Sequence, residues 1–197
     1  MRKLSFLLAV VMLLTSMLAF TACGGDKDTG KTDEPADDVK TIASADAVLK
    51  DMVAAIEEKA PYTDLVAEFL YKENDPDEML MWTYGVIDLN ANDLVEDYVI
   101  TMPSDYSQTL AIIKFKDGMT TEDFTEVKDA VTEWYLKDRA SALQMYMPEE
   151  YAAMQWAIDN PDAIWHQYGD NMLVLAIYGD KAPDAVWTAI DDYLAGK

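Results

Sequence analysis

Residue types that build metal, redox and nucleic-acid sites are scarce in this chain of 197 residues. A single cysteine and a single histidine exclude an intrachain disulfide framework, a multi-cysteine metal site and the usual two-histidine zinc or iron sites. Fifteen lysine and arginine residues stand against 37 acidic ones, which gives a formal net charge of −22. Nucleic-acid binding needs a basic surface, and anionic lipid attracts polybasic segments. The charge balance therefore argues against nucleic-acid partners and against adhesion to anionic lipid through a basic patch.

Apolar side chains are abundant: 51% of the residues are hydrophobic. That fraction is enough to build a core and excludes wholesale disorder. The length suits one domain of ordinary size. We therefore expect one folded domain, with shorter segments of other composition beside it.

The first 22 residues have the composition of a secretory leader. Arg2 and Lys3 are followed by an uncharged run over residues 4–20, and then by small side chains. Phe20-Thr21-Ala22-Cys23 resembles the lipobox of bacterial lipoproteins, with Phe20 where an aliphatic residue is usual. The resemblance implies that residues 1–22 are a signal peptide and that Cys23 is lipidated and becomes the mature N-terminus.

The alternative is an uncleaved membrane helix, because residues 4–22 are long enough to span a bilayer. Both interpretations keep the positive end in the cytoplasm and place the rest of the chain outside it. We expect the lipoprotein: a cell-membrane protein anchored by its lipid and facing outside the cytoplasm, with two or more acyl chains for stable attachment.

The segment after the cysteine is acidic and nearly free of apolar side chains. Residues 24–40 read GGDKDTGKTDEPADDVK, which predicts that 23–40 form the lipidated cysteine and a disordered acidic tether. Such a tether would average roughly 20–25 Å from end to end. The remaining residues, 41–197, are predicted to form a single globular domain.

Hydrophobic periodicity and turn residues divide this domain into helices and strands. Helices are predicted over residues 44–59, 63–72, 78–84, 120–146, 148–160 and 183–194. Strands are predicted over residues 98–102, 109–115, 163–168 and 172–178, the last apolar on both faces and so interior to the sheet. The expected fold class is α+β: a small antiparallel sheet in the order β-β-α-β-β-α, with helices packed on one face and N-terminal helices before it.

Several short motifs occur in a characteristic order. They are Tyr84-Gly85-Val86-Ile87-Asp88, Glu96-Asp97-Tyr98, Ile113-Lys114-Phe115-Lys116-Asp117, Arg139, Tyr146-Met147-Pro148-Glu149-Glu150-Tyr151 and Gly169-Asp170-Asn171. In order and spacing they resemble the bacterial lipoprotein family called domain of unknown function 4358, over about residues 84–195 and the leader. The resemblance implies a fold and a location; no catalytic residue is carried over from it.

One acidic loop has part of the spacing of a calcium site. Asp88, Asn90 and Asn92 place oxygen ligands at loop positions 1, 3 and 5, and Asp93 follows. However, Asp93 stands where the turn needs glycine, and Val99 stands where a bidentate glutamate belongs. A capped, solvated turn is the alternative, and we expect no bound metal and no cofactor.

Catalytic patterns are incomplete. Ser104, Ser107 and Ser141 have only His166 as a base, no nucleophile elbow is present, and His166 falls in a predicted edge strand. Tryptophan among carboxylates is typical of sugar-binding proteins, but these tryptophans have mostly core spacing; they are Trp82, Trp134, Trp156, Trp165 and Trp187. Met145 and Met147 flank Tyr146, a spacing too common to indicate copper, and we expect them to fill the core.

Arg139 is the only arginine after the leader. It could hold a carboxylate or phosphate ligand, or it could pair or pack within the fold. The sequence as a whole favours a non-enzymatic binding or accessory domain at the cell envelope, whose partner is an envelope protein or a small ligand. The alternatives are a calcium-binding or envelope-sensing module and a cryptic cell-wall hydrolase.

Overall fold

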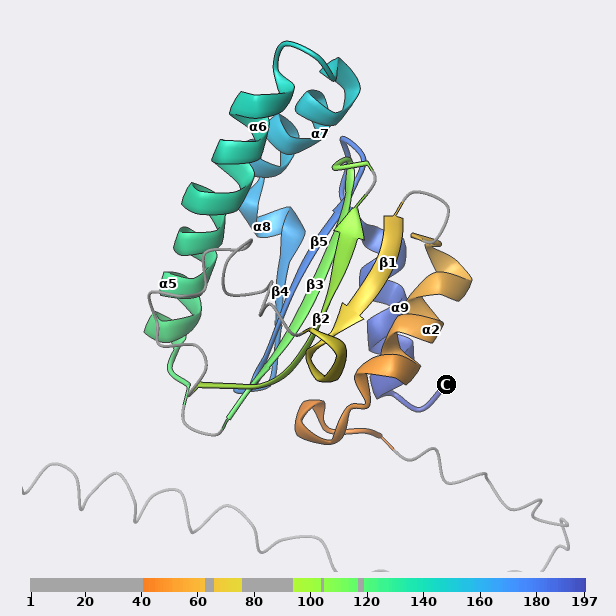
Figure 1. The fold of residues 1–197 in the computed structure, drawn as a ribbon. Coiled ribbons are helices and arrows are strands. Elements are labelled where there is room, and N and C mark those ends of the chain that lie inside the picture. The colour runs from red at the N-terminus through yellow and green to blue at the C-terminus, as the bar shows by residue number, and fades with distance from the viewer. Residues whose placement is uncertain (1–40, 63–65, 76–93, 104, 117–118) are drawn as a thin grey trace, which may run out of the picture. The chain divides into compact units, whose positions relative to one another are not determined.

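The fold is built on one antiparallel sheet of five strands in the order β1-β2-β3-β5-β4 (Figure 1). The structure is a computed structural model, and it describes residues 41–62, 66–75, 94–103, 105–116 and 119–197. The strands are β1 (Val66–Tyr71), β2 (Val95–Pro103), β3 (Gln108–Phe115), β4 (Trp165–Tyr168) and β5 (Met172–Tyr178). Strands β1 and β4 form the two edges.

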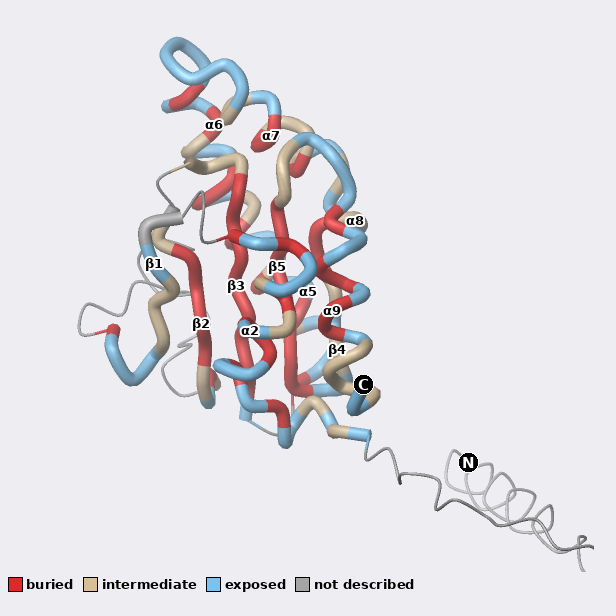
Figure 2. The backbone as a smooth tube through the Cα atoms, turned by 90° about the vertical axis from the view of Figure 1, so that its right-hand side faces the viewer, coloured by how far each residue is buried: buried red, intermediate tan, exposed pale blue. Residues whose placement is uncertain are grey.

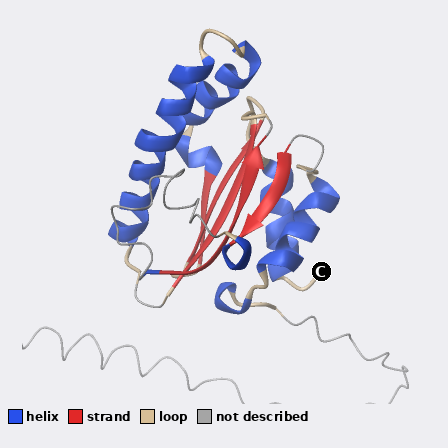
Figure 3. Ribbon diagram, in the orientation of Figure 1, coloured by secondary structure: helices blue, strands red, loops and turns tan. Residues whose placement is uncertain are grey.

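Helices surround this sheet on both sides (Figure 3). Before the sheet come a short 3-10 turn, η1 (Ser44–Asp46), and α2 (Leu49–Lys59). A second 3-10 turn, η2 (Lys72–Asn74), follows β1. The others are α5 (Thr121–Val131), the π-helical turn η4 (Thr132–Leu136), α6 (Lys137–Leu143), α7 (Pro148–Asp159), α8 (Pro161–Ile164) and α9 (Asp184–Leu194).

Strand β5 shows why both faces must be covered. Leu173, Leu175 and Ile177 belong to one hydrophobic cluster, while Met172 and Val174 belong to another on the opposite face. Successive residues of a strand point to opposite faces, so an uninterrupted apolar strand needs a partner layer on each. Figure 2 shows β2, β3 and β5 buried over most of their length. The prediction of an interior strand over 172–178 is confirmed.

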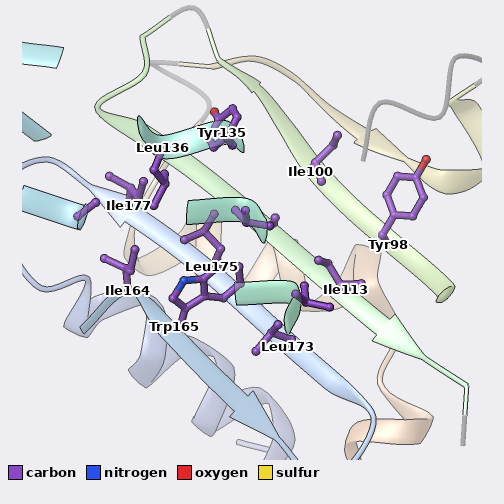
Figure 4. Close-up of a cluster of buried hydrophobic side chains, with 14 of the residues drawn as sticks. Tyr98, Ile100, Ile113, Tyr135, Leu136, Ile164, Trp165, Leu173, Leu175 and Ile177 are labelled. Carbon is purple, nitrogen blue, oxygen red and sulfur yellow. The ribbon is translucent and has the colours of Figure 1, made fainter. Parts of the chain in front are cut away.

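The first cluster lies beneath α5, η4, α6 and α7. Tyr135 and Leu136 of η4 lie over strand residues such as Leu175 and Ile177 (Figure 4). Helix α5 begins where the sequence predicts, at the N-cap Thr120, whose Oγ1 accepts from the backbone N–H of Asp123 (3.2 Å). The Asp123 carboxylate accepts from Thr120 N–H in return (2.7 Å), which lowers the pKa of Asp123.

The second cluster lies beneath α2 and α9, which contact each other. Lys59 and Asp192 form an ion pair between these helices. The backbone N–H of Ile42 donates to Leu194 O (2.7 Å), so the first described residues lie beside the end of the C-terminal helix.

The α+β class and the antiparallel sheet are confirmed, with two differences in detail. Helices cover both faces of the sheet, whereas the sequence predicts them on one face. The predicted helix over 63–72 is wrong: residues 66–71 form the edge strand β1, so among the described residues η1 and α2 precede the sheet. The spacing of its apolar residues fits both the helical and the strand periodicity. Pairing with β2, as in Leu70 with Ile100, makes this segment a strand. The predicted helix over 78–84 lies outside the described residues.

Substitution of Gly169, in the turn between β4 and β5, tests the close contact between this turn and Ser44. Gly169 has φ +63°, and a Cβ there would collide with Ser44 Oγ, which donates to Asn171 Oδ1 (2.8 Å). Gly179 has φ +74° but open space around the same position. Gly179→Ala should therefore cost only the left-handed backbone strain, about 1–2 kcal/mol. We expect Gly169→Ala to lower the free energy of unfolding, measured by urea denaturation, by more than Gly179→Ala does, because the new Cβ also collides with Ser44. Equal losses would show that Ser44 moves aside without cost.

Candidate functional site

The connection between α6 and α7 exposes three large side chains in succession. Met145, Tyr146 and Met147 are 76%, 77% and 46% exposed. We call residues 144–147 the α6–α7 tip. Single exposed apolar residues are common on protein surfaces, but a contiguous group usually marks an interaction site.

Backbone hydrogen bonds hold the tip in place. The N–H groups of Tyr146 and Met147 donate to the carbonyl of Leu143, a buried residue at the end of α6 (3.1 and 2.9 Å). Pro148 occupies the first position of α7, where its missing N–H has no intrahelical acceptor to lose. The exposed side chains therefore project from a turn fixed at both ends.

The turn of the β2–β3 hairpin lies against the start of α7. Asp105 Oδ1 accepts from Ser107 N–H (2.8 Å), which closes the turn. The N–H of Tyr106 donates to Glu150 Oε2 in the first turn of α7 (2.9 Å). Ser107 O in turn accepts from Gly179 N–H (2.7 Å), which ties the hairpin to the end of β5.

Arg139 completes this arrangement from α6. Its guanidinium carbon lies 5.5 Å from the centre of the Tyr106 ring, within cation–π range, and its side chain is half-buried. This contact accounts for Arg139 within the fold, which is the packing alternative of the sequence analysis.

Between the hairpin and α7 lies a pocket of about 350 Å³. Its lining residues are Asp105, Ser107, Met147, Pro148, Glu149 and Glu150. Three of them carry carboxylates and none carries a positive charge, while Met147 joins the pocket to the exposed tip. Such a site attracts cations and accepts hydrogen bonds, and the apolar border offers contact area beside it.

His166 lies on β4, the edge strand that the sequence predicts. His166 of β4 stacks on Trp187 of α9, with ring centres 4.0 Å apart and planes at 8°. Among the described residues no hydrogen bond joins His166 to a serine. Ser104 lies outside the described residues, Ser107 binds through its backbone in the hairpin turn, and Ser141 is exposed on α6. Within the described ranges, the structure thus brings no serine and histidine together.

The protonation of His166 can be measured directly, since it is the only histidine of the chain. Burial lowers its pKa, nearby Asp191 opposes this, and Lys128 adds a smaller lowering. The folded chain therefore binds the proton more weakly than the unfolded chain, so this group's contribution to stability is present above the unfolded pKa and is lost as pH falls from there through the lower folded pKa. We expect the imidazole NMR titration to have a lower midpoint in the folded chain than in denaturant. An equal or higher midpoint would contradict the burial argument.

The aromatic and methionine predictions have mixed outcomes. Trp165 and Trp187 are buried and Trp156 is half-buried, as core spacing implies, whereas Trp134 on η4 is 64% exposed. The expectation that Met145 and Met147 fill the core is wrong, because the chain turns between two helices there and leaves them in solvent.

Several predicted site residues lie outside the described part of the chain. They are Cys23, Trp82, Asp88, Asn90, Asn92 and Asp93. Within the described part, no group of three or more histidine, cysteine or acidic side chains is arranged to hold a metal ion. Nor does that part contain a helix with the length and hydropathy needed to cross a membrane.

Sequence reasoning missed the meeting of Tyr106, Arg139 and Glu150, and with it the pocket. Two of the three residues were in motifs noted for their order, Arg139 and the Tyr146–Tyr151 segment. The remaining signal was the apolar run Met145-Tyr146-Met147 directly before Pro148, since a helix-starting proline fixes the preceding residues in a connection.

Comparison with known proteins gives a family. No curated protein and no solved structure matches the chain. A family model described as "Domain of unknown function (DUF4358)" matches residues 67–158, from β1 to the end of α7. This match begins before residue 84 and ends before the Gly169 turn, so it differs from the predicted extent at both ends. It includes Tyr106, Arg139, the α6–α7 tip and the acidic pocket, and residues 67–158 of this chain belong to the DUF4358 family.

Proposed function

We propose that this protein is a lipid-anchored binding domain of the cell envelope, without catalytic activity, which uses the α6–α7 tip and its pocket to hold a partner. The observation that carries the proposal is the fixed, solvent-exposed turn of Met145, Tyr146 and Met147 beside an acidic pocket. Burial of such side chains in a partner is favourable, and a rigid turn loses little entropy on binding.

The placement of the tip supports this proposal. In Figures 1 and 2 the connection between α6 and α7 lies at one end of the sheet and the C-terminus at the other. Ile42 is hydrogen-bonded to Leu194, near that C-terminus. The described part of the chain therefore begins near the end of the sheet that is opposite the α6–α7 tip.

Anchoring through Cys23 is tested by metabolic labelling with an alkyne fatty acid in a bacterial host. We expect label on the full chain in the membrane fraction, and loss of the label in Cys23→Ala. An unlabelled wild-type chain would overturn the lipid anchor and leave the membrane-helix alternative.

Binding through the tip is tested on intact cells with a photo-crosslinking amino acid in place of Tyr146. The control carries the same amino acid in place of Trp134, which is also an exposed aromatic residue. We expect a discrete adduct from position 146 that position 134 does not give. Identical adducts at both positions, or none at position 146, would overturn the proposed binding surface.

A further inference from the structure

We infer that the partner is a basic polypeptide segment: a lysine or arginine side chain enters the pocket of Asp105, Glu149 and Glu150, and neighbouring apolar residues cover the α6–α7 tip. This inference rests on the proposed function and names the chemistry of its partner.

The electrostatics of the pocket favour a cation. Asp105 comes from the hairpin and Glu149 and Glu150 from α7, so acidic residues of two separate elements line the pocket. One oxygen each of Asp105 and Glu150 is occupied by a backbone N–H, which fixes both side chains and leaves each a second oxygen. Arg139 lies against the Tyr106 ring and does not line the pocket. Among the described residues, no ion pair engages the carboxylates of the lining, so a cation of the partner can balance their charge.

The surroundings of the pocket favour a polypeptide over a free ion. A small cation would leave Met145 and Tyr146 as exposed as before. A peptide that places its basic residue in the pocket also brings apolar residues to these side chains. Tyrosine is enriched in the residues that carry binding energy, and methionine adapts to varied partners.

The charge of the whole chain argues against two other occupants. A net charge of −22 opposes a second copy of the same chain and opposes an anionic membrane surface. The same charge speeds the approach of a basic segment. The complementary partner is thus a basic protein or peptide of the envelope.

The test measures fluorescence anisotropy of a labelled peptide of alternating lysine and leucine, with the full chain in neutral detergent micelles. A glutamate-leucine peptide and a lysine-serine peptide are the comparison probes. We expect saturable binding of the lysine-leucine peptide, weaker binding of the lysine-serine peptide and none of the glutamate-leucine peptide. Equal binding of the two lysine peptides would show general attraction to an acidic protein and overturn the inference.

Matched variants test whether the peptide binds at the pocket and the α6–α7 tip. Glu149→Lys should weaken binding of the lysine-leucine peptide by about fivefold or more. Glu122→Lys is the control, because Glu122 is likewise an exposed acidic residue in the first turn of a helix, α5. Tyr146→Ser should weaken binding by at least about fivefold, with Trp134→Ser as its control. Equal effects of a variant and its control would overturn the assignment to the pocket and tip.

Failure of this inference is distinguishable from failure of the proposed function. If the crosslinker at position 146 gives a specific adduct that the lysine-leucine peptide does not displace, the binding surface stands and the basic partner is overturned. If no adduct forms at position 146, the proposed binding surface and the basic partner are both overturned. Displacement of the adduct by the lysine-leucine peptide, and not by the glutamate-leucine peptide, supports both.

Discussion

Replacement of Leu175 by alanine is expected to lower the free energy of unfolding by about 2–5 kcal/mol. Leu175 has no exposed surface, and its backbone lies between Ala111 of β3 and Trp165 of β4. Its side chain belongs to the cluster beneath α5, η4, α6 and α7. The loss has two parts: the transfer free energy of the removed carbons, and the cavity that a sheet held on both sides cannot close.

The comparison variant for this experiment is Leu194→Ala. Leu194 is only partly buried at the end of α9, packed against the cluster on the other face. Part of its side chain is already in water and the helix end can move, so a smaller loss is expected in the same urea titration. If both variants lost the same free energy, the sheet between β3 and β4 would not be packed as tightly as its burial indicates.

The sequence predicted those elements whose signals are local. The helix predicted from residue 120 begins correctly, because a hydroxyl followed by acidic residues precedes its apolar positions, and the structure shows the reciprocal hydrogen bonds of the Thr120 cap. Both hairpins were placed from turn residues between apolar runs, although residues 163–164 belong to α8 rather than to a strand. Edge strand β1 was missed because a run of six residues can fit both the helical and the strand periodicity. Only its pairing with β2 shows that it is a strand.

The helices on both faces could have been inferred. An antiparallel sheet commonly leaves one face in water, and helices were predicted on one face only. Strands β3 and β5 are buried along nearly their whole length, and the apolar sequence of β5 was recognised as two-sided. A strand buried on both faces requires a layer on each, so the fold class was right while the arrangement of its layers was incomplete.

The candidate site was beyond local sequence reasoning. Tyr106 and Glu150 are 44 residues apart in the chain, and Arg139 comes from a different helix than Glu150. Periodicity predicts which face of a helix is buried, but not which loop meets which helix end. The exposure of Met145 and Met147 follows from the same cause, because it depends on where α6 stops relative to the hairpin.

Replacement of Lys114 by methionine is expected to lower the free energy of unfolding by about 1.5–3 kcal/mol. Lys114 lies on β3, and its side chain is buried at 7% exposure. Its ammonium donates to the carbonyls of Ala45 (2.9 Å) and Ala47 (3.2 Å). Methionine keeps the length and the apolar stem but leaves both carbonyls without this donor, and hydrogen bonds to a charged group are among the stronger ones in proteins.

Lys116→Met is the matched control, two residues further along, because the Lys116 side chain is exposed. We expect little change in its urea midpoint. Hydrogen exchange adds a second measurement: Lys114→Met should speed exchange in residues 42–48, which the ammonium attaches to the sheet, more than in α5. If Lys114→Met proved as stable as Lys116→Met, water would be satisfying the two carbonyls. The buried lysine in the Ile113–Asp117 motif would then be dispensable for holding the N-terminal segment.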